Sequence, residues 1–583
     1  MLKLARYLRT YRAECVLSPL FKLLEAIFGL LVPLVMADVI DVGIPAADQA
    51  YVIWRGVLLV GMGVLGLASA AAAQYFCAKL AAGFGTLLRD DLFRHVLSLS
   101  SADLDDIGRS SLVTRVTNDT QQVQDGVNMF FRLILRSPFV VLGALVLTFV
   151  IDGTEGLIYL ATIVVLFVVV FAVMYVAARR YRAVQGRLDA ILQHTSDNLI
   201  GVRVVRAFRR EGDEVAGFDR EAAGLRDDQV RVGDISGLLN PLTYVATNMG
   251  LVAALWAGGF TVDAGAMTQG GLVALVNYSA QILVELVKMA NLIIQEAKAV
   301  ACAARVNEVF AHANTMPDGS ESAASATAEV RFDDVTFSYP DGAAPALAHV
   351  SFEAAAGQTV GVIGGTGSGK STLAALLMRF YDAREGTVSL GGRDVRDYRV
   401  ASLRKAVAIV EQGGRLFSGT IGENLRWGDR TATDDDLMRA VATAQAGNVV
   451  DAKGEGLDAR VEQMGRNFSG GQRQRLTIAR ALARHPKVLI LDDASSALDF
   501  ATDAALRGAL ARELVGTTTF VISQRVTSIR SADKILVLDR GRLVGAGTHD
   551  ELVRGCDVYR EICASQLPPG SLPEASASRG GGA

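Results

Sequence analysis

The chain has 583 residues, of which 51% are hydrophobic and 20% charged, and its mean hydropathy is positive at +0.31. This composition excludes a disordered or acidic interaction protein. A net charge of −3 with a pI of about 6.2 provides no basic surface for nucleic acid, so no nucleic-acid partner is expected. The five cysteines are scattered singly, so neither a disulfide framework nor a zinc site is expected.

Six apolar stretches in the first half of the chain are long enough to cross a bilayer, which takes about 20 residues. They are Val16–Ile40, Val52–Phe76, Leu133–Ile151, Leu157–Ala178, Leu238–Phe260 and Gly271–Glu296. The fourth carries no charged residue. It predicts a membrane span, because a buried soluble helix is rarely apolar on every face over this length. The first and the sixth contain both acidic and basic residues and are weaker candidates.

The charges between these stretches predict their orientation. Loops after the second and fourth stretches are rich in lysine and arginine, whereas those on the other side carry mainly acidic residues. By the positive-inside rule, both termini and the two long connections are expected on the cytoplasmic side of a plasma (inner) membrane. The connections Ala78–Ser98 and Ala177–Leu199 lack proline and predict helices that continue beyond the bilayer, rather than inserted soluble domains. The Ala-, Gly- and Arg-rich composition points to a bacterium.

The second half of the chain has a different pattern. Residues 311–326 are small and polar and predict a linker. From residue 327 to 565, short β-rich runs alternate with helical runs, as in an α/β domain. Residues 566–583 are rich in proline, glycine and serine and predict a disordered tail. We therefore expect an all-α membrane domain over residues 1–310, followed by one α/β soluble domain.

A glycine-rich turn in the soluble half predicts phosphate binding. The apolar strand Val360–Ile363 leads into a turn of the pattern GxxxxGK[ST], and a helical run follows. Glycines let backbone N–H groups point at phosphates, the helix N-terminus adds positive potential, a lysine neutralises phosphate oxygens and a hydroxyl can bind Mg²⁺. The residues expected to hold the phosphates are Gly364, Gly365, Thr366, Gly367, Ser368, Gly369, Lys370, Ser371 and Thr372.

Two further motifs support this prediction. The apolar strand Val488–Leu491 ends in Asp492 and Asp493, and an acid at the end of such a strand is the expected partner of Mg²⁺. Between the two strands, Ser469, Gly470, Gly471 and Gln472 open a helix and predict another anion-binding N-terminus. Seen alone, this last motif could also be an ordinary serine N-cap with a glycine turn.

Together, these motifs resemble those of ATP-binding cassette (ABC) half-transporters of the exporter type, and the resemblance covers nearly the whole chain. Asn467–Gln472 is similar to the family signature LSGGQ, with Phe468 at the leucine position. The resemblance implies a six-helix polytopic membrane domain joined to a P-loop NTPase domain. It implies ATP and Mg²⁺ as cofactors, with Tyr339 stacking on adenine and Gln412 sensing the metal beside Ser371 and Asp492.

The resemblance also implies how two such chains work together. Two nucleotide-binding domains close head-to-tail, and each ATP lies between the phosphate loop of one domain and the signature of the other. Ser495–Asp499 matches the D-loop of the family and places Asp499 near nucleotide. Coupling segments between the membrane and soluble halves would fall near Arg109–Thr117 and Gly201–Glu211.

The sequence departs from the family pattern at two catalytic positions. Active members have glutamate as the general base directly after the acid that binds Mg²⁺, whereas this chain has Asp493. A second position, where the family has a histidine that contacts the γ-phosphate, holds Gln524. We therefore expect a site that binds ATP and hydrolyses it slowly. Because the signature is intact, the simplest interpretation is a heterodimer with a second half-transporter that carries the competent site; the alternative is a homodimer that uses Asp493.

The sixth apolar stretch carries a polar stripe. At 100° per residue, Asn277, Gln281, Glu285, Lys288, Asn291 and Gln295 fall on one face. A polar stripe in a membrane helix must face protein or water. One hypothesis is that Asn277, Gln281, Glu285 and Lys288 line the translocation cavity. The other is that the stripe packs on the partner's helices, with Glu285 and Lys288 forming a pair.

These observations favour an ATP-driven transporter subunit that exports drugs, lipids or other small amphipathic molecules across a lipid bilayer by alternating access. An importer on the same scaffold and a regulatory, nucleotide-sensing subunit remain as alternatives. A soluble cassette ATPase is excluded by the six apolar stretches.

Overall fold

The computed structural model describes residues 2–340, 342, 344–452 and 454–567, and the chain divides into two compact units. The first, called the membrane unit, consists of the residues up to Leu97 together with Arg109–His312. The second, called the nucleotide unit because of its phosphate-loop motif, combines Ser98–Gly108 with the chain from Ala313 onward. The predicted tail from residue 568 lies outside the described residues. Gln566, predicted as its first residue, is the last residue of a helix.

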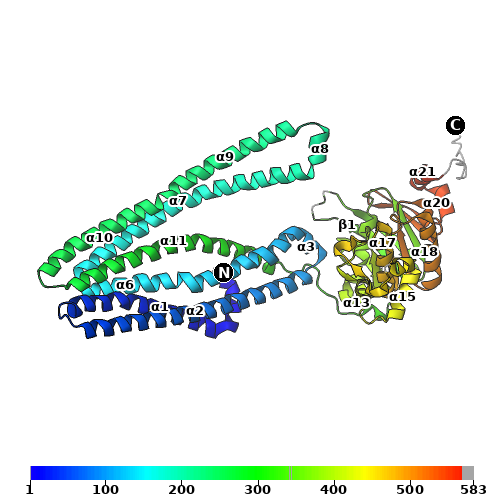
Figure 1. Ribbon diagram of the computed structural model, residues 1–583. Helices are drawn as coiled ribbons and strands as arrows, with labels where there is room; N and C mark the ends of the chain where they lie inside the picture. Colours follow the sequence, from blue (N-terminus) through cyan, green and yellow to red (C-terminus); the bar gives the residue numbers. More distant parts are fainter. Residues whose placement is uncertain (1, 341, 343, 453, 568–583) are drawn as a thin grey trace. The chain divides into compact units, whose positions relative to one another are not determined.

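The membrane unit is helical throughout its described length (Figure 1). Its main helices are α1 (Arg12–Asp38), α2 (Gln49–Ser98), α6 (Arg136–Ile151), α7 (Gly153–Ile200), α9 (Glu211–Gly237), α10 (Leu239–Asp263) and α11 (Gln269–Ala311). Shorter segments are η1 (Leu2–Tyr11), η2 (Val39–Gly43), α4 (Arg109–Thr114), η3 (Arg115–Asp119), α5 (Thr120–Met129), η4 (Phe130–Ile134) and α8 (Val202–Ala207).

Six helical segments among the described residues are long and apolar enough to cross a membrane, and each contains one of the six predicted stretches, the sixth as far as Met289, where the matching segment ends. The apolar windows of the first five are only 17–28% buried within the chain, and that of Gln269–Met289 is 50% buried. Exposing this much apolar surface to water would be costly. In a lipid bilayer it costs nothing, because the surrounding acyl chains are as apolar as the side chains. The six predicted spans are therefore confirmed.

Two of these helices continue well beyond bilayer length, as predicted from the absence of proline. α2 has 50 residues and α7 has 48, which is about 70 Å of helix at 1.5 Å per residue. α7 ends at Gly201, the chain turns through α8, and α9 returns alongside α7 (Figure 1). The predicted coupling segment Gly201–Glu211 contains this turn.

A second bend is formed by α3 (Ser101–Ile107). The predicted coupling segment Arg109–Thr117 follows it directly and belongs to α4 and η3. Ser100 and Asp103 form a capping box that starts α3, and Gly108, with φ +83°, ends it. The spacing of Ser100 and Asp103 was the signal in the sequence that marked this bend.

α11 is the centre of the membrane unit, since it packs against α1, α5, α6, α7 and α10. Two buried tyrosines tie its neighbours to it. Tyr278 of α11 donates a hydrogen bond to the carbonyl oxygen of Leu30 (2.7 Å), and Tyr159 of α7 donates one to that of Leu275 (2.6 Å). Buried hydroxyl groups need such partners in a low-dielectric interior, so both contacts fix how the helices approach each other.

The nucleotide unit is built on a six-stranded sheet in the order β12-β11-β3-β10-β9-β6. Its strands are β3 (Thr359–Gly364), β6 (Val407–Val410), β9 (Val488–Asp492), β10 (Thr518–Ile522), β11 (Lys534–Asp539) and β12 (Arg542–Gly547). All pairs are parallel except β11 with β12. The five parallel strands are buried along most of their length, as expected of a parallel sheet that is covered on both faces.

A second, antiparallel sheet and the helices complete this unit. The sheet has the order β2-β1-β4-β5 and consists of β1 (Val330–Phe337), β2 (Leu347–Ala354), β4 (Glu385–Leu390) and β5 (Arg393–Asp394); β7 (Gly419–Thr420) pairs with β8 (Arg460–Val461). The helices are α12 (Lys370–Leu377), α13 (Val400–Ala406), α14 (Ile421–Arg426), α15 (Asp434–Thr443), α16 (Gly447–Asp451), α17 (Gly470–Leu482), α18 (Phe500–Glu513), α19 (Val526–Ile529), α20 (His549–Gly555) and α21 (Asp557–Gln566). Single 3₁₀ turns are η5 (Ala323–Ser325), η6 (Val395–Asp397), η7 (Gly456–Asp458) and η8 (Gln463–Gly465).

The predicted linker lies against the nucleotide unit. Arg379, which is 1% exposed, donates a hydrogen bond to the carbonyl oxygen of Pro317 (2.8 Å). Glu321 forms a bridge with the backbone of Tyr398 and an ion pair with Arg393 (2.7 Å). Residues around this segment therefore have fixed partners, although its composition alone predicts a flexible connection.

Asp103 connects α3 to this linker. Its carboxylate accepts hydrogen bonds from the Ser100 hydroxyl (2.6 Å) and from the Thr315 hydroxyl (2.8 Å) and backbone N–H (3.2 Å). Burial raises the pKa of Asp103, but the hydrogen bonds from Ser100 and Thr315 outweigh it and lower the pKa to about 2. The ionised carboxylate is thus the form that the fold stabilises.

We predict that Asp103→Ala loosens α3, because it removes the cap and the contact with Thr315 together. The loss is about 1–2 kcal/mol, so amide hydrogen exchange across residues 98–108 should become roughly 5- to 30-fold faster. Asp106→Ala, at an exposed position of the same helix, is the matched control. Equal exchange in the two variants would contradict the role of Asp103.

The same contact predicts an acid dependence. Since the folded pKa of Asp103 is lowered, its contribution to stability is complete above the ordinary pKa of aspartate, about 4, and is lost as the pH falls towards 2. Hydrogen exchange of residues 98–108 in the wild-type chain, corrected for the intrinsic pH dependence, should therefore accelerate over this window. The Asp103→Asn variant should show no such step.

Candidate functional site

The predicted phosphate-binding residues lie at one edge of the six-stranded sheet. β10 lies between β3 and β9, and all three strands run in the same direction. Ile522, the last residue of β10, is paired with Val362 on one side and with Asp492 on the other. The carboxyl ends of the three strands therefore meet. The glycine-rich turn, the two aspartates and the segment after β10 are brought to the same place, as is usual for ligand sites of open α/β sheets.

The turn between β3 and α12 has the backbone that its glycines predict. Gly367 and Gly369 have φ values of +77° and +99°, a region that residues with a side chain rarely adopt. Lys370, the first residue of α12, donates hydrogen bonds from Nζ to the carbonyl oxygens of Gly364 (2.9 Å) and Gly365 (2.7 Å). Burial lowers the pKa of this lysine. Its ammonium group lies inside the turn, ready to bind an anion in place of the carbonyl oxygens.

Asp492 and Ser371 provide neighbouring oxygens. Burial raises the pKa of Asp492, and a hydrogen bond from the Ser371 hydroxyl opposes that effect. A carboxylate beside a hydroxyl suits a hard divalent cation such as Mg²⁺. Within the described ranges, no group of three His, Cys, Asp or Glu side chains could hold a metal. A cation here would therefore complete its coordination with phosphate oxygens and water, as Mg²⁺ commonly does.

Asp493 has an unusual backbone and a specific partner. Its φ is +50°, and its N–H donates to the carbonyl oxygen of Ile522 (2.9 Å). Its carboxylate accepts a hydrogen bond from Nε2 of Gln412 (3.0 Å), which follows β6. A residue with a side chain in the left-handed region costs of order 1 kcal/mol and is common at functional sites. The geometry brings two predicted site residues together, Gln412 and Asp493.

Gln524 lies in what we call the switch segment, Ser523–Val526, directly after β10. Its side chain is exposed, and its backbone carbonyl accepts a hydrogen bond from Gln566 (2.7 Å). The next residue, Arg525, donates to the carbonyl oxygen of Ser496 (3.4 Å). No local pattern predicts this contact, because Gln566 is 42 residues away in the chain.

The signature segment forms a helix N-terminus, as predicted. Ser469 and Gln472 form a capping box: the Gln472 N–H donates to the Ser469 hydroxyl, and the Gln472 side chain accepts from the Ser469 N–H (2.8 Å). Gly471 lies against the D-loop, because a Cβ there would come 2.8 Å from the carbonyl oxygen of Ala497. Asp499 is the N-cap of α18 and accepts hydrogen bonds from the N–H and hydroxyl of Thr502. In this chain Asp499 therefore has a helix-capping role, and hydrogen bonds from Thr502 lower its pKa.

Tyr339 lies beside the start of α12. Its hydroxyl is 3.2 Å from that of Thr372, and its ring makes edge contacts with Phe337 (4.9 Å) and Tyr381 (5.3 Å). The side chain remains about one-third exposed (36%). An exposed aromatic face next to a phosphate-binding turn is suited to stacking with a nucleobase.

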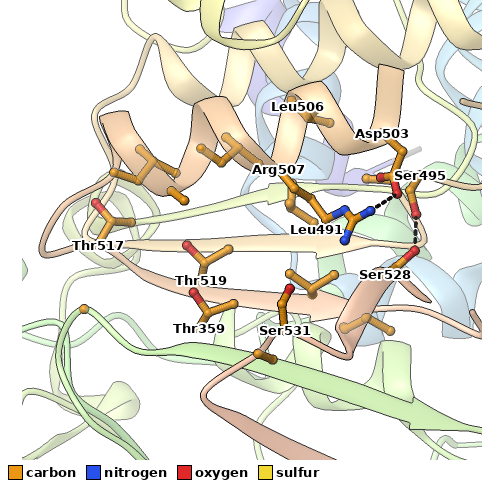
Figure 2. A pocket seen from close by; sticks show the side chains of 18 of the residues that line it. Thr359, Leu491, Ser495, Asp503, Leu506, Arg507, Thr517, Thr519, Ser528 and Ser531 are labelled. Atoms are coloured by element: carbon orange, nitrogen blue, oxygen red, sulfur yellow. Dashed lines mark hydrogen bonds and ion pairs between the residues drawn. The ribbon is translucent and has the colours of Figure 1, made fainter. Parts of the chain in front are cut away.

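A separate cavity of about 370 Å³ lies beneath α18 (Figure 2). Hydroxyl groups of strand residues such as Thr359 and Thr519 line it, and Arg507 pairs with Asp503 at its mouth (3.2 Å). Burial raises the pKa of Asp503. At one end the hydroxyls of Ser495 in the D-loop and Ser528 in α19 are 3.3 Å apart. The cavity thus lies behind the D-loop, and no residue of the phosphate loop lines it.

The polar stripe on α11 is partly engaged within the membrane unit. Glu285 is 4% exposed, pairs with Arg136 of α6 and accepts a hydrogen bond from Ser137 (2.8 Å). Arg136 also pairs with Glu25 of α1 (3.2 Å). The other stripe residues whose side chains the structure describes are not buried, and Asn291 lies outside that part of the chain. Those others are Asn277, Gln281, Lys288 and Gln295.

Comparisons with known proteins agree with this geometry. The family model "ABC transporter transmembrane region" matches residues 15–286, and the model "ABC transporter" matches residues 347–496. An uncharacterized ABC transporter ATP-binding protein of Mycobacterium tuberculosis is 35% identical over 97% of both chains. The ATP-dependent lipid A-core flippase of Salmonella typhimurium is 27% identical over 96% of both. A solved bacterial Atm1-family ABC exporter with ATP bound superimposes with a TM-score of 0.81 at 25% identity, over 96% of this chain and 100% of that one.

We predict that Gly369→Ala disrupts the phosphate-binding turn. A Cβ at this position would lie 2.5 Å from the carbonyl oxygen of Ala346, and the φ of +99° is strained for alanine. The expected cost is about 1–3 kcal/mol, visible as a lower melting temperature and as weaker binding of a fluorescent ATP analogue. Gly365→Ala is the matched control, because its Cβ would meet no atom within 4 Å. Equal behaviour of the two variants would contradict the steric explanation.

Proposed function

From its membership of the ABC transporter family, which makes the chain an ATP-driven exporter subunit, we propose that it works as one half of a heterodimer with asymmetric ATP sites. Its own phosphate loop would form the site that binds ATP and hydrolyses it slowly. The observation that carries this proposal is the pair of substitutions at the end of β9 and after β10: aspartate at position 493 and glutamine at position 524.

Asp493 is poorly placed for a general base. Its carboxylate is one methylene shorter than that of glutamate and lies roughly 1.5 Å further back, and misplacement of about 1 Å can cost on the order of a hundredfold in rate. Gln412 holds this carboxylate (3.0 Å). Hydrolysis would require that contact to be rearranged before Asp493 could orient water.

Gln524 offers a weaker contact to the nucleotide than histidine. Its exposed amide can donate a hydrogen bond to a γ-phosphate, but it carries no titratable proton. ATP would be bound by Lys370 and the backbone N–H groups of the turn, with Tyr339 against the adenine. Mg²⁺, held by Ser371 and Asp492 and sensed by Gln412, would neutralise phosphate charge.

The intact signature supports the second half of the proposal. Ser469 and Gln472 present a well-capped helix N-terminus, and Gly471 places it against the D-loop. This surface would complete the ATP site of the partner, which should carry the glutamate and histidine missing here. A homodimer that uses Asp493 is the main alternative. A mainly regulatory, nucleotide-sensing subunit is a second alternative, which differs from the proposal only in how slowly this chain's own site turns over ATP.

Closure of the two nucleotide-binding domains would be passed to the membrane helices through the two bends, α3 and α8. Within the nucleotide unit, Tyr381 donates a hydrogen bond to Asp105 of α3, and Thr315 contacts Asp103. Both termini and these bends would lie on the cytoplasmic side, in agreement with the positive charge near them. ATP binding would then bias a two-state membrane domain between inward and outward openings.

The proposed substrates are small amphipathic molecules such as drugs or lipids. The named relative from Salmonella typhimurium is a lipid A-core flippase, which supports an amphipathic class without defining the compound. Asn277, Gln281 and Lys288 would face the translocation cavity. Glu285 would face it as well, but its ion pair with Arg136 gives it a second role in joining α11 to α6. An importer on this scaffold would use the same residues.

We predict that this chain, purified alone in nanodiscs, has a slow ATPase, and that Asp493→Glu combined with Gln524→His raises its turnover about 10- to 100-fold. The measurement is phosphate release at saturating MgATP. Asp435→Glu, at an exposed position of α15, is the matched control. Turnover of the unmodified chain comparable to that of ordinary exporters would contradict the heterodimer proposal.

We also predict that Glu285→Gln acts mainly through structure. Removing the charge takes away the Glu285 partner of both Arg136 and Lys288 and leaves Arg136 its pair with Glu25. The membrane unit should therefore lose about 1–3 kcal/mol. Thermal stability in nanodiscs measures this loss, and Gln281→Asn, which changes no charge at an intermediate position one turn earlier, is the control. Unchanged stability with selective loss of transport of cationic compounds would instead assign Glu285 to substrate recognition.

A further inference from the structure

The last residue of α21 is hydrogen-bonded to the switch segment through its side chain. Gln566, the final residue of α21, donates a hydrogen bond from Nε2 to the carbonyl oxygen of Gln524 (2.7 Å). Its Oε1 accepts a hydrogen bond from the backbone N–H of Val526 (2.9 Å). The amide therefore uses both of its ends on the backbone on either side of Arg525. We propose that Gln566 is a positioning residue that holds Gln524 in place for the γ-phosphate of ATP.

The geometry of this contact suits a positioning role. The two hydrogen bonds hold the backbone on both sides of Arg525 and so restrain its torsion angles. This restraint determines the position of the Gln524 Cα, from which the side chain extends. Neither bond consumes the side chain of Gln524, which stays exposed. A side chain that fixed Gln524 by bonding its amide would compete with the nucleotide; Gln566 leaves that amide available.

α21 is a rigid support for this contact. Cys563 and Tyr559, about one and two turns before Gln566, are fully buried and pack in a cluster with Val526 and Ile529 of α19. The Tyr559 hydroxyl is also 2.8 Å from Nδ1 of His549 in α20. Because α21 is anchored by this core, the position of Gln566 is fixed by packing rather than by its own two hydrogen bonds.

The opposite side of the switch segment is bound to the D-loop. Arg525 donates to the carbonyl oxygen of Ser496, and Ser523 accepts a hydrogen bond from the N–H of Arg525 (3.0 Å). In the proposed dimer the D-loop lies next to the partner's ATP site. The switch segment would thus be held between the C-terminal helix and a loop that reports on the other nucleotide, and Gln566 sets the side that belongs to this chain.

This inference rests on the proposed function, because it takes Gln524 as the residue that meets the γ-phosphate. Removing Gln566 should therefore weaken the binding of nucleotides that have a γ-phosphate and leave ADP unaffected. A role limited to the stability of α21 would weaken both nucleotides equally or neither. The expected effect is modest, about three- to fivefold, because the hydrogen bonds of Gln566 are partly exposed to water.

The test uses the full chain in nanodiscs, with its partner where one is present, and the variants Gln566→Ala and Gln524→Ala. Photolabelling with 8-azido-ATP, resolved by chain, is competed with a non-hydrolysable ATP analogue or with ADP. Both variants should lose about three- to fivefold in affinity for the ATP analogue, with ADP unchanged. Ser565→Ala is the matched control, since its hydroxyl bonds only to Ile562 within α21 among the described contacts.

Hydrogen exchange of residues 523–529 without nucleotide separates the two ways in which this can fail. Faster exchange in Gln566→Ala than in Ser565→Ala supports the contact itself. A second outcome is faster exchange in Gln566→Ala, with the ratio of ATP-analogue to ADP affinity unchanged in both Gln566→Ala and Gln524→Ala. That outcome would overturn the assignment of Gln524 to the γ-phosphate. Unchanged exchange and unchanged affinity in Gln566→Ala, with a loss in Gln524→Ala, would overturn the role of Gln566 alone.

Discussion

The parallel register of β3, β10 and β9 is the constraint on which the site depends. Ile522 lies opposite Val362 in one neighbour and opposite Asp492 in the other, so the three strands end almost level. A slip by one residue would move every side chain of β10 to the other face of the sheet. It would also separate the phosphate turn from the aspartates. The buried apolar residues of these strands prevent such a slip, and the core of the unit therefore determines the geometry of its polar edge.

That constraint explains why the nucleotide site was largely predictable. The motif after β3 and the acid after β9 each require a strand before them, and strands of this apolar character are central and parallel in an α/β domain. Because β3 and β9 run parallel on either side of β10, their carboxyl ends lie at the same edge of the sheet. The membrane half was predictable for a different reason: six stretches of bilayer length leave few options, because backbone groups in lipid must be satisfied within helices.

What the sequence did not predict depends on contacts between distant residues. The capping box of Ser100 and Asp103 was visible, but nothing in the local sequence showed that Thr315 would bind the same carboxylate. The contact between Gln412 and Asp493 joins the ends of two strands that lie 81 residues apart. Gln566 was predicted as part of a disordered tail because proline and glycine follow it closely. It belongs to a helix because Tyr559 and Cys563 of that helix are buried in the core. The composition of the segment as a whole does not show these two buried positions.

The membrane unit is surrounded by lipid and the nucleotide unit by water, and this difference determines where charged side chains can lie. In the membrane unit, Glu285 is tolerated because Arg136 and Ser137 satisfy it, and that pairing ties α11 to α6. In the nucleotide unit, Lys370 is held by the carbonyl oxygens of Gly364 and Gly365, and Asp492 by the hydroxyl of Ser371. Burial opposes the charged form of both groups: it lowers the pKa of Lys370 and raises that of Asp492. A bound polyphosphate and cation would oppose both effects, because each brings a charge opposite to that of the buried group.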